Sequence, residues 1–223
     1  MTRQLAFDLP PRTTHGRGDF FVSTANDAAL KGIDDWRDWP DGRMLLIGPE
    51  GSGKTHLVQV WAAQCGAAIV VAADLPGLDL PTLLAQGAVA VEDADRMAGS
   101  PAAEAALFHF YNLAAEAKAA LLVTARGPVP GWGLGLPDLQ SRMQSMAQLA
   151  LSPPDDALLA AVLVKHFADR QLPVSSGLVL YLLARMERSF AGARALAAAL
   201  DREALASGKP VTQKLAKRVL GEE

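Results

Sequence analysis

A run of glycines that ends in a lysine and a threonine has the residue types needed to bind phosphate. It reads Gly48-Pro49-Glu50-Gly51-Ser52-Gly53-Lys54-Thr55. An apolar segment, Met44 to Ile47, precedes it, and a segment of helical character, His56 to Gln64, follows it. Glycines let successive backbone N–H groups point at one anion, the start of a helix adds positive potential, and the lysine reaches the outer phosphates. The pattern predicts a nucleotide phosphate loop, with an ordinary glycine-rich turn as the alternative.

The predicted nucleotide contacts come from this run and from the residue after it. They are Gly48, Gly51, Ser52, Gly53, Lys54, Thr55 and His56. The Thr55 hydroxyl is also a predicted magnesium ligand, so the implied cofactors are ADP or ATP together with Mg2+. His56 and His109 each stand alone on a helical segment without metal-ligand spacing. Packing or helix capping is therefore the alternative role for His56.

Two acidic residues follow a second apolar segment. Ala88 to Val91 is continued directly by Glu92 and Asp93. After a buried strand, one such acid can hold magnesium while its neighbour polarises the attacking water. A solvated strand end is the alternative, but the phosphate loop earlier in the chain favours the catalytic interpretation. Glu92 and Asp93 are thus predicted catalytic residues, with Glu92 also a metal ligand.

The elements that must position these residues follow from the hydrophobic pattern. Apolar runs at Met44–Ile47, Ala68–Val71, Ala88–Val91 and Ala120–Val123 alternate with helical stretches, which indicates a parallel sheet covered on both faces. After Pro153-Pro154 the strand signals stop and alanine- and leucine-rich helices are expected. These are Ala157–Asp169, Ser176–Arg188, Ala191–Ser207 and Thr212–Leu220. We predict an α/β domain at 19–152, a small all-α lid domain at 153–223 and a flexible tail at 1–18.

Composition limits the classes of function. The chain has 223 residues, 50% of them hydrophobic, and 21 basic residues against 24 acidic ones give a formal net charge of -3. DNA-binding domains usually carry a basic excess, so direct duplex binding is not favoured. Cys65 is the single cysteine. No apolar run reaches the ~20 residues of a membrane-spanning helix, and none at the N-terminus resembles a signal peptide. A cytoplasmic protein without membrane contact is expected.

Further segments agree in order and spacing with a known family. They are Gly53–Leu57, Ala106–Asn112, Leu139–Arg142 and Ala193–Leu196, and Phe21–Asn26 precedes them. Together they resemble successive boxes of the AAA+ module of DnaA, the bacterial replication initiator. The resemblance implies a P-loop AAA+ parallel-sheet domain followed by a lid, with Phe21–Asn26 lining the adenine pocket.

Within that family the sequence is more similar to the regulators known as Hda than to initiators. DnaA initiators continue into a helix-turn-helix reader domain, whereas this sequence ends at Glu223, so a complete initiator is not expected. Gln4 to Leu9 resembles the Hda motif that binds the sliding clamp, the beta subunit of DNA polymerase III. An extended tail can place alternating apolar groups in a groove while a glutamine amide fixes the register. The implied clamp contacts are Gln4, Leu5, Phe7 and Leu9; a strand packed on the domain edge is the alternative.

The resemblance also assigns roles to three further residues. Arg142 corresponds to an arginine finger that acts in trans on the γ-phosphate held by a neighbouring subunit. Thr124 corresponds to a sensor I hydroxyl and Arg194 to a sensor II arginine, both nucleotide contacts. A surface arginine, a strand-end threonine and a helix-surface ion pair are the respective alternatives.

Two departures from the initiator pattern predict weak hydrolysis of the protein's own nucleotide. Glu92 stands where initiators have aspartate, and Arg126 stands where they have an acid after the sensor I strand. The implied function is a regulator that, with DNA-loaded clamp, stimulates hydrolysis of DnaA-bound ATP and prevents premature re-initiation of replication. DNA would be reached only through the clamp, and self-association is an open expectation. A loader or motor that turns over its own ATP is the alternative; an oligomerising DNA-binding initiator fragment is disfavoured by the charge.

Overall fold

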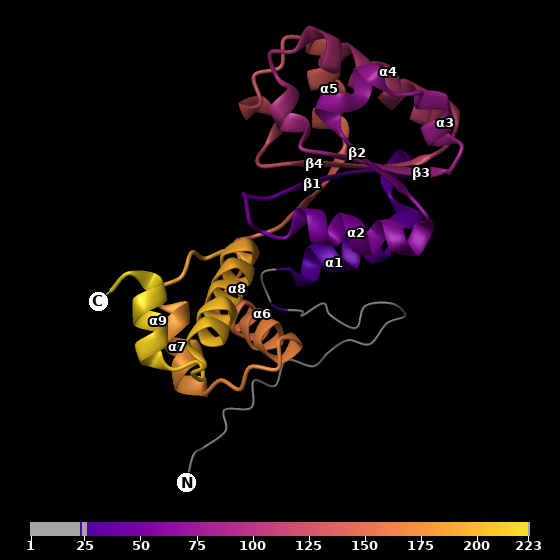
Figure 1. Cartoon of the computed structure of the whole chain (residues 1–223). Helices are drawn as coiled ribbons and strands as arrows, with labels where there is room; N and C mark the ends of the chain where they lie inside the picture. The colour runs from indigo at the N-terminus through magenta and orange to yellow at the C-terminus, as the bar shows by residue number, and fades with distance from the viewer. Residues whose placement is uncertain (1–22, 24–25, 223) are drawn as a thin grey trace. The chain divides into compact units, whose positions relative to one another are not determined.

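The computed structural model describes residue 23 and residues 26–222, which separate into two compact units (Figure 1). One unit is Asn26–Ser152, and residues 153–222 belong to the other. The clamp contacts implied by the sequence, Gln4, Leu5, Phe7 and Leu9, lie outside the described residues, as do most residues of the 21–26 segment.

The described part of the first unit is built on a five-stranded, fully parallel sheet. Its strands are β1 Arg43–Ile47, β2 Ala68–Val71, β3 Ala88–Glu92, β4 Ala120–Ala125 and β5 Ala147–Ala150. Their order in the sheet is β2-β3-β4-β1-β5. The parallel sheet expected from the continuous apolar runs is confirmed, because helices cover both of its faces and leave β1, β3 and β4 buried.

Helices form a layer on each face of this sheet (Figure 1). On one face lie α1 Asp27–Asp34 and α2 Lys54–Cys65; on the other lie α3 Leu80–Leu84, α4 Pro101–Glu116 and α5 Pro137–Ser145. Sequence signals define where α4 begins, since the Ser100 hydroxyl accepts the Ala103 N–H and Pro101 occupies the first helical position. Its Leu107 and Phe110 are fully buried against Leu121 and Val123 of β4. Removing this apolar surface from water is the main stabilisation of the layer.

Strand order decides which residues meet at each edge of the sheet. Because the strands are parallel, their carboxyl ends share one edge, which we call the strand-end edge. Ile47 is in register with Ala125, and Val91 with Val123, so the segments that follow β1, β3 and β4 leave the sheet together. Arg43 begins β1 at the opposite, strand-start edge.

The second unit is helical throughout its described elements. It contains α6 Asp156–Asp169, α7 Ser176–Leu183, α8 Phe190–Ser207 and α9 Gln213–Leu220. Each helix begins after a side-chain cap: Asp155, Ser175, Ser189 and Thr212 accept the N–H of Leu158, Leu178, Gly192 and Leu215. Across the described part of the chain, no helix is long and apolar enough to span a bilayer.

One helix of this unit is shorter than its periodicity suggests. A helix over Ser176–Arg188 is expected from the sequence, but α7 ends at Leu183. The chain then turns tightly, so that a Cβ added to Gly192 would lie 2.6 Å from the Glu187 carbonyl oxygen. The Ser189 hydroxyl begins α8 by accepting the Gly192 N–H at 2.9 Å. The cap of the next helix and this close approach end α7 where apolar spacing alone would continue it.

Candidate nucleotide-binding site

The glycine-rich loop joins β1 to α2 in a backbone conformation that requires glycine. Gly51 has φ 75° and Gly53 has φ 97°, both in the left-handed region where a side chain is strained. Gly53 is also the cap residue of α2, so the cap itself offers no side-chain acceptor to the first-turn N–H groups. These groups, with the positive end of the helix, are suited to an anion.

The first glycine of the loop is packed too closely for any side chain. A Cβ on Gly48 would lie 2.7 Å from Ser52 Oγ and 2.8 Å from the Leu151 carbonyl oxygen. The Gly48 N–H donates to the Ala125 carbonyl at 3.1 Å, which ties the start of the loop to the end of β4. Ser52 Oγ is buried and has no hydrogen-bond partner among the described residues. A buried hydroxyl inside a loop of backbone donors fits a bound phosphate, whose oxygen can accept a hydrogen bond from it.

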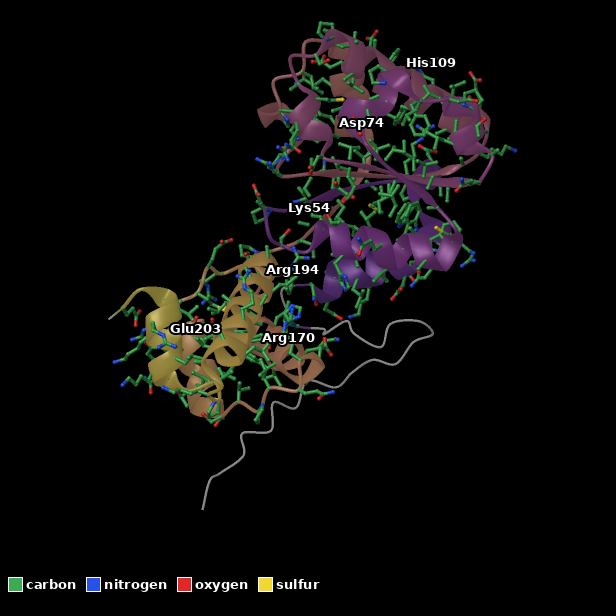
Figure 2. All side chains as sticks on the ribbon, in the orientation of Figure 1. Lys54, Asp74, His109, Arg170, Arg194 and Glu203 are labelled. Carbon is green, nitrogen blue, oxygen red and sulfur yellow. The ribbon has the colours of Figure 1, made fainter. Side chains whose placement is uncertain are left out.

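Lys54 lies at the first turn of α2 and reaches back over the loop (Figure 2). It is only 8% exposed, and its ammonium donates to the Gly48 carbonyl at 2.6 Å and the Pro49 carbonyl at 3.0 Å. Burial lowers its pKa, an effect that Asp93 and Asp95 oppose and Arg126 reinforces. The loop therefore holds a partly desolvated positive charge at the place where the sequence predicts phosphate.

The acidic segment and the end of β4 are joined directly. The Asp93 N–H donates to Thr124 Oγ1 at 3.1 Å, and Thr124 is 1% exposed. Asp93 itself has φ 56°, a conformation uncommon outside glycine, and such strain is concentrated at functional sites. Its carboxylate lies 3.4 Å from the Arg96 guanidinium. The structure thus brings Lys54, Asp93 and Thr124 to one edge of the sheet.

The other predicted residues of this edge are placed less closely. Glu92 is the last residue of β3 and is half-buried, while Thr55 and His56 are exposed on the first turn of α2. Nowhere in the described residues do three His, Cys, Asp or Glu side chains group to hold a metal by themselves. Mg2+ is commonly bound by one or two carboxylates together with substrate phosphates, so a Thr55 hydroxyl with Glu92 or Asp93 fits a nucleotide-bound ion.

Sequence reasoning missed two acids and underestimated one arginine at this edge. The Arg126 N–H donates to Asp95 Oδ1 at 3.2 Å, and its guanidinium lies 3.5 Å from the Glu50 carboxylate. Glu50 lies within the glycine run, but the sequence predicts no role for it. Asp95 had a sequence signal, since it is a further acid just after Glu92-Asp93.

Arg142 lies in α5, at the strand-start edge rather than beside the loop. Its guanidinium carbon is 5.9 Å from the centre of the Tyr111 ring, and that of Arg43, the first residue of β1, is 4.0 Å from the same ring. Arg142 is exposed, whereas Tyr111 is buried. Buried Glu104 supports the approach to α5, because its carboxylate accepts the Leu136 N–H at 2.8 Å and the Gly99 N–H at 3.1 Å. Arg142 is therefore on the opposite edge from the Lys54 loop of its own chain.

Arg194 belongs to the helical unit, where it is exposed on α8 (Figure 2). Arg194 lies near α6, which contains His166. Burial lowers the pKa of His166, and the positive charges of Arg170 and Arg194 lower it further. The sensor role that the resemblance implies for Arg194 stays a prediction.

Comparison with solved structures identifies the fold. No family model matches the sequence. Domain III of the Thermotoga maritima replication initiation protein DnaA is 18% identical with a TM-score of 0.77, covering 91% of this chain and 94% of that one. AMPPCP-bound DnaA from Aquifex aeolicus is 16% identical with a TM-score of 0.61, covering 81% of this chain and 62% of that one. The Thermotoga maritima RuvB Holliday junction branch migration motor is 17% identical with a TM-score of 0.66, covering 87% of this chain and 65% of that one.

These structural similarities define the fold class of the protein. The chain has the P-loop AAA+ fold, with the five-stranded parallel sheet and surrounding helices that DnaA and RuvB share. Among the solved structures with this fold, domain III of the Thermotoga DnaA is matched over nearly the whole of both chains.

Proposed function

We propose that this protein is a DnaA-related AAA+ regulator that binds adenine nucleotide and stimulates hydrolysis of the ATP bound by the DnaA initiator. The observation that carries the proposal is the division of the sheet into two edges. The glycine-rich loop with Lys54, which we call the phosphate cradle, lies at the strand-end edge. The exposed Arg142 lies at the strand-start edge. A group that serves a neighbouring molecule must face away from its own nucleotide. The similarity of fold to DnaA domain III supports the same choice of partner.

The cradle is proposed to hold ADP or ATP with Mg2+. Backbone N–H groups of the loop and of the first turn of α2 would hold the phosphates, and Lys54 would donate to phosphate oxygens in place of the Gly48 and Pro49 carbonyls. Ser52 supplies a hydroxyl that is otherwise unpaired among the described residues. Thr55 and Glu92 are the proposed Mg2+ ligands, Asp93 is held in place by Thr124, and Arg194 is the proposed sensor in the helical unit. When bound, the nucleotide would supply the phosphate charge that these donors are placed to meet.

Arg142 is proposed to act in trans. A guanidinium placed against the γ-phosphate of a neighbouring subunit stabilises the charge that develops as the phosphoryl group is transferred. Tyr111 and Arg43 border Arg142 on its own molecule, and its exposure leaves the guanidinium accessible to DnaA.

The remaining part of the proposal concerns where the protein acts. Gln4, Leu5, Phe7 and Leu9 are proposed to bind the beta sliding clamp, so that the regulator works on DnaA near newly replicated DNA and touches DNA only through the clamp. The protein would act in the cytoplasm, without membrane contact. Replication would then not restart too early.

A second candidate function rests on the strand-end edge. Lys54, Asp93 and Thr124 are close together there, as an enzyme that turns over its own ATP requires. A loader or motor of this kind would hydrolyse ATP without DnaA or clamp. The departures at Glu92 and Arg126 favour the regulator.

Phosphate release separates the two functions. The purified protein is measured alone, with ATP-bound DnaA, and with ATP-bound DnaA plus DNA-loaded clamp, each in the presence of ADP. The regulator predicts little release alone and strong release in the full mixture. A variant with Gln4→Ala and Leu5→Ala should lose clamp binding and stimulation while retaining nucleotide binding. Rapid release by the protein alone, unaffected by DnaA, would instead identify a motor.

A further inference from the structure

Arg126 forms ion pairs with Glu50 and Asp95 beside the glycine-rich loop. Glu50 projects from the loop and is 83% exposed, and its carboxylate lies 3.5 Å from the Arg126 guanidinium. Asp95, from the turn after β3, lies 4.0 Å from the same guanidinium and accepts the Arg126 N–H at 3.2 Å. Three segments that are distant in sequence therefore meet at a single arginine.

The backbone places this arginine beside the loop. Arg126 directly follows Ala125, whose carbonyl accepts the N–H of Gly48 at 3.1 Å. Its charge is close enough to Lys54 to help lower the pKa of that lysine, after burial, which is the largest cause. A second positive charge, the Arg126 guanidinium, thus lies beside the glycine-rich loop of its own chain, where it is 41% exposed.

We propose that Arg126 reads the terminal phosphate of the bound nucleotide, and that Glu50 competes with that phosphate for the guanidinium. This inference rests on the proposed nucleotide binding and adds to it a residue that distinguishes ATP from ADP. With ADP, Arg126 stays on Glu50 and Asp95; with ATP, the guanidinium leaves Glu50 for the γ-phosphate. Asp95 holds the Arg126 backbone in both cases.

The relative strengths of the two contacts favour such an exchange. An ion pair as exposed as Glu50–Arg126 contributes little, because water and salt screen it. A guanidinium meets a phosphate with a planar pair of N–H donors in a charge-assisted contact, which is stronger. Arg126 is therefore able to leave Glu50 when a third phosphate is present, but has no equivalent partner when only two are bound.

The test compares affinities for Mg2+ with AMPPCP, which keeps a third phosphate, and for Mg2+ with ADP. Isothermal titration calorimetry on the full chain measures both for wild type, Arg126→Gln, Glu50→Gln and the double variant. Arg126→Gln should weaken AMPPCP binding about tenfold and change ADP binding less than twofold. Glu50→Gln should act in the opposite direction and strengthen AMPPCP binding a few-fold, because the competitor is removed. In the double variant the gain from Glu50→Gln should disappear.

A matched arginine controls for loss of charge. Arg37 is exposed, stacks on Trp36 at 4.4 Å, and precedes β1 away from the loop. Arg37→Gln should leave the ratio of AMPPCP to ADP affinity as in the wild type. Thermal melts without nucleotide should show all variants folded, since none of these side chains is buried.

The possible results are distinguishable. An unchanged affinity ratio in Arg126→Gln, or equal weakening of both ligands, overturns the inference and leaves the proposed nucleotide binding intact. Weaker AMPPCP binding by Glu50→Gln overturns the competition. A wild type that binds neither ligand removes the proposed function together with this inference.

Discussion

The two edges of the parallel sheet differ in how they hold a positive charge. At the strand-end edge, Lys54 is buried, donates to two backbone carbonyls and sits on a loop whose glycines have left-handed backbone. At the strand-start edge, Arg142 is exposed and rests beside an aromatic ring that it shares with Arg43. The Lys54 charge is thus enclosed by its own loop, whereas the Arg142 charge is exposed at the surface.

Under the proposed function, this difference lets one domain act on two ligands. The buried ammonium of Lys54 donates to the Gly48 and Pro49 carbonyls, and these hydrogen bonds offset part of the hydration that it loses on burial. The planar guanidinium of Arg142 is exposed, and its carbon lies 5.9 Å from the centre of the Tyr111 ring, within the range of a cation–π contact. The parallel strands place Lys54 and Arg142 at opposite edges of the sheet, so the two side chains do not meet within one molecule.

Removing the exposed Arg142 charge is expected to have the largest effect and tests the difference between the two edges most directly. Arg142→Ala should reduce the clamp-dependent hydrolysis of DnaA-bound ATP by roughly 10³-fold or more, as expected for loss of an arginine finger. Nucleotide affinity and thermal stability should stay unchanged, since the side chain is exposed. Arg142→Lys should rescue poorly, because a point charge lacks the planar fork. If Arg142→Ala stimulates like the wild type, the strand-start edge is not catalytic, and Arg126 becomes the next arginine to test.

Removing the enclosed charge should produce the complementary loss. Lys54→Ala should weaken nucleotide binding by about 100-fold or more, because a buried charge that meets phosphate is lost outright. Calorimetry with ADP and AMPPCP measures the effect. Lys118→Ala, an exposed lysine after α4, is the matched control and should bind as the wild type does. Undiminished binding by Lys54→Ala would show that the loop is not the nucleotide site.

The close packing of the loop predicts a smaller effect. Gly48→Ala should lower the free energy of unfolding of the nucleotide-free protein by about 1–3 kcal/mol, because its Cβ would overlap Ser52 and the Leu151 carbonyl. Gly77→Ala is the control, since no atom lies within 4 Å of a Cβ at that position. Urea unfolding of both variants measures the difference. Equal stability would mean that the loop gives way at little cost.

The smallest expected effect concerns the Tyr111 ring, which lies beside Arg142. Tyr111→Leu should lower the stimulated rate by roughly two- to fivefold, since a cation–π contact to an exposed arginine is weak. Tyr111→Phe keeps the ring and should retain the wild-type rate. The maximal rate and the half-saturating concentration for DnaA are measured separately. A change confined to the half-saturating concentration would indicate that Tyr111 contributes to docking and does not orient Arg142.

Some of this organisation was readable from local sequence. The parallel sheet was predicted because β1, β3 and β4 are continuous apolar runs between helices. The strand, glycine loop and helix around Lys54 follow in the expected order, since glycine spacing and helix onset are short-range properties. The helix predicted from apolar spacing alone at Ser176–Arg188 is too long. The Ser189 cap and the close approach at Gly192 belong to the start of α8, which apolar spacing does not reveal.

The sequence by itself determined which segments become strands and helices, and which residues carry the chemistry of phosphate binding. Only the tertiary structure decided which of those residues meet. The Asp93–Thr124 and Asp95–Arg126 hydrogen bonds each join residues 31 positions apart, and the Arg43–Tyr111–Arg142 group combines three elements. Such contacts depend on the order β2-β3-β4-β1-β5, which no local pattern encodes, because strand order is set by how whole faces bury against one another.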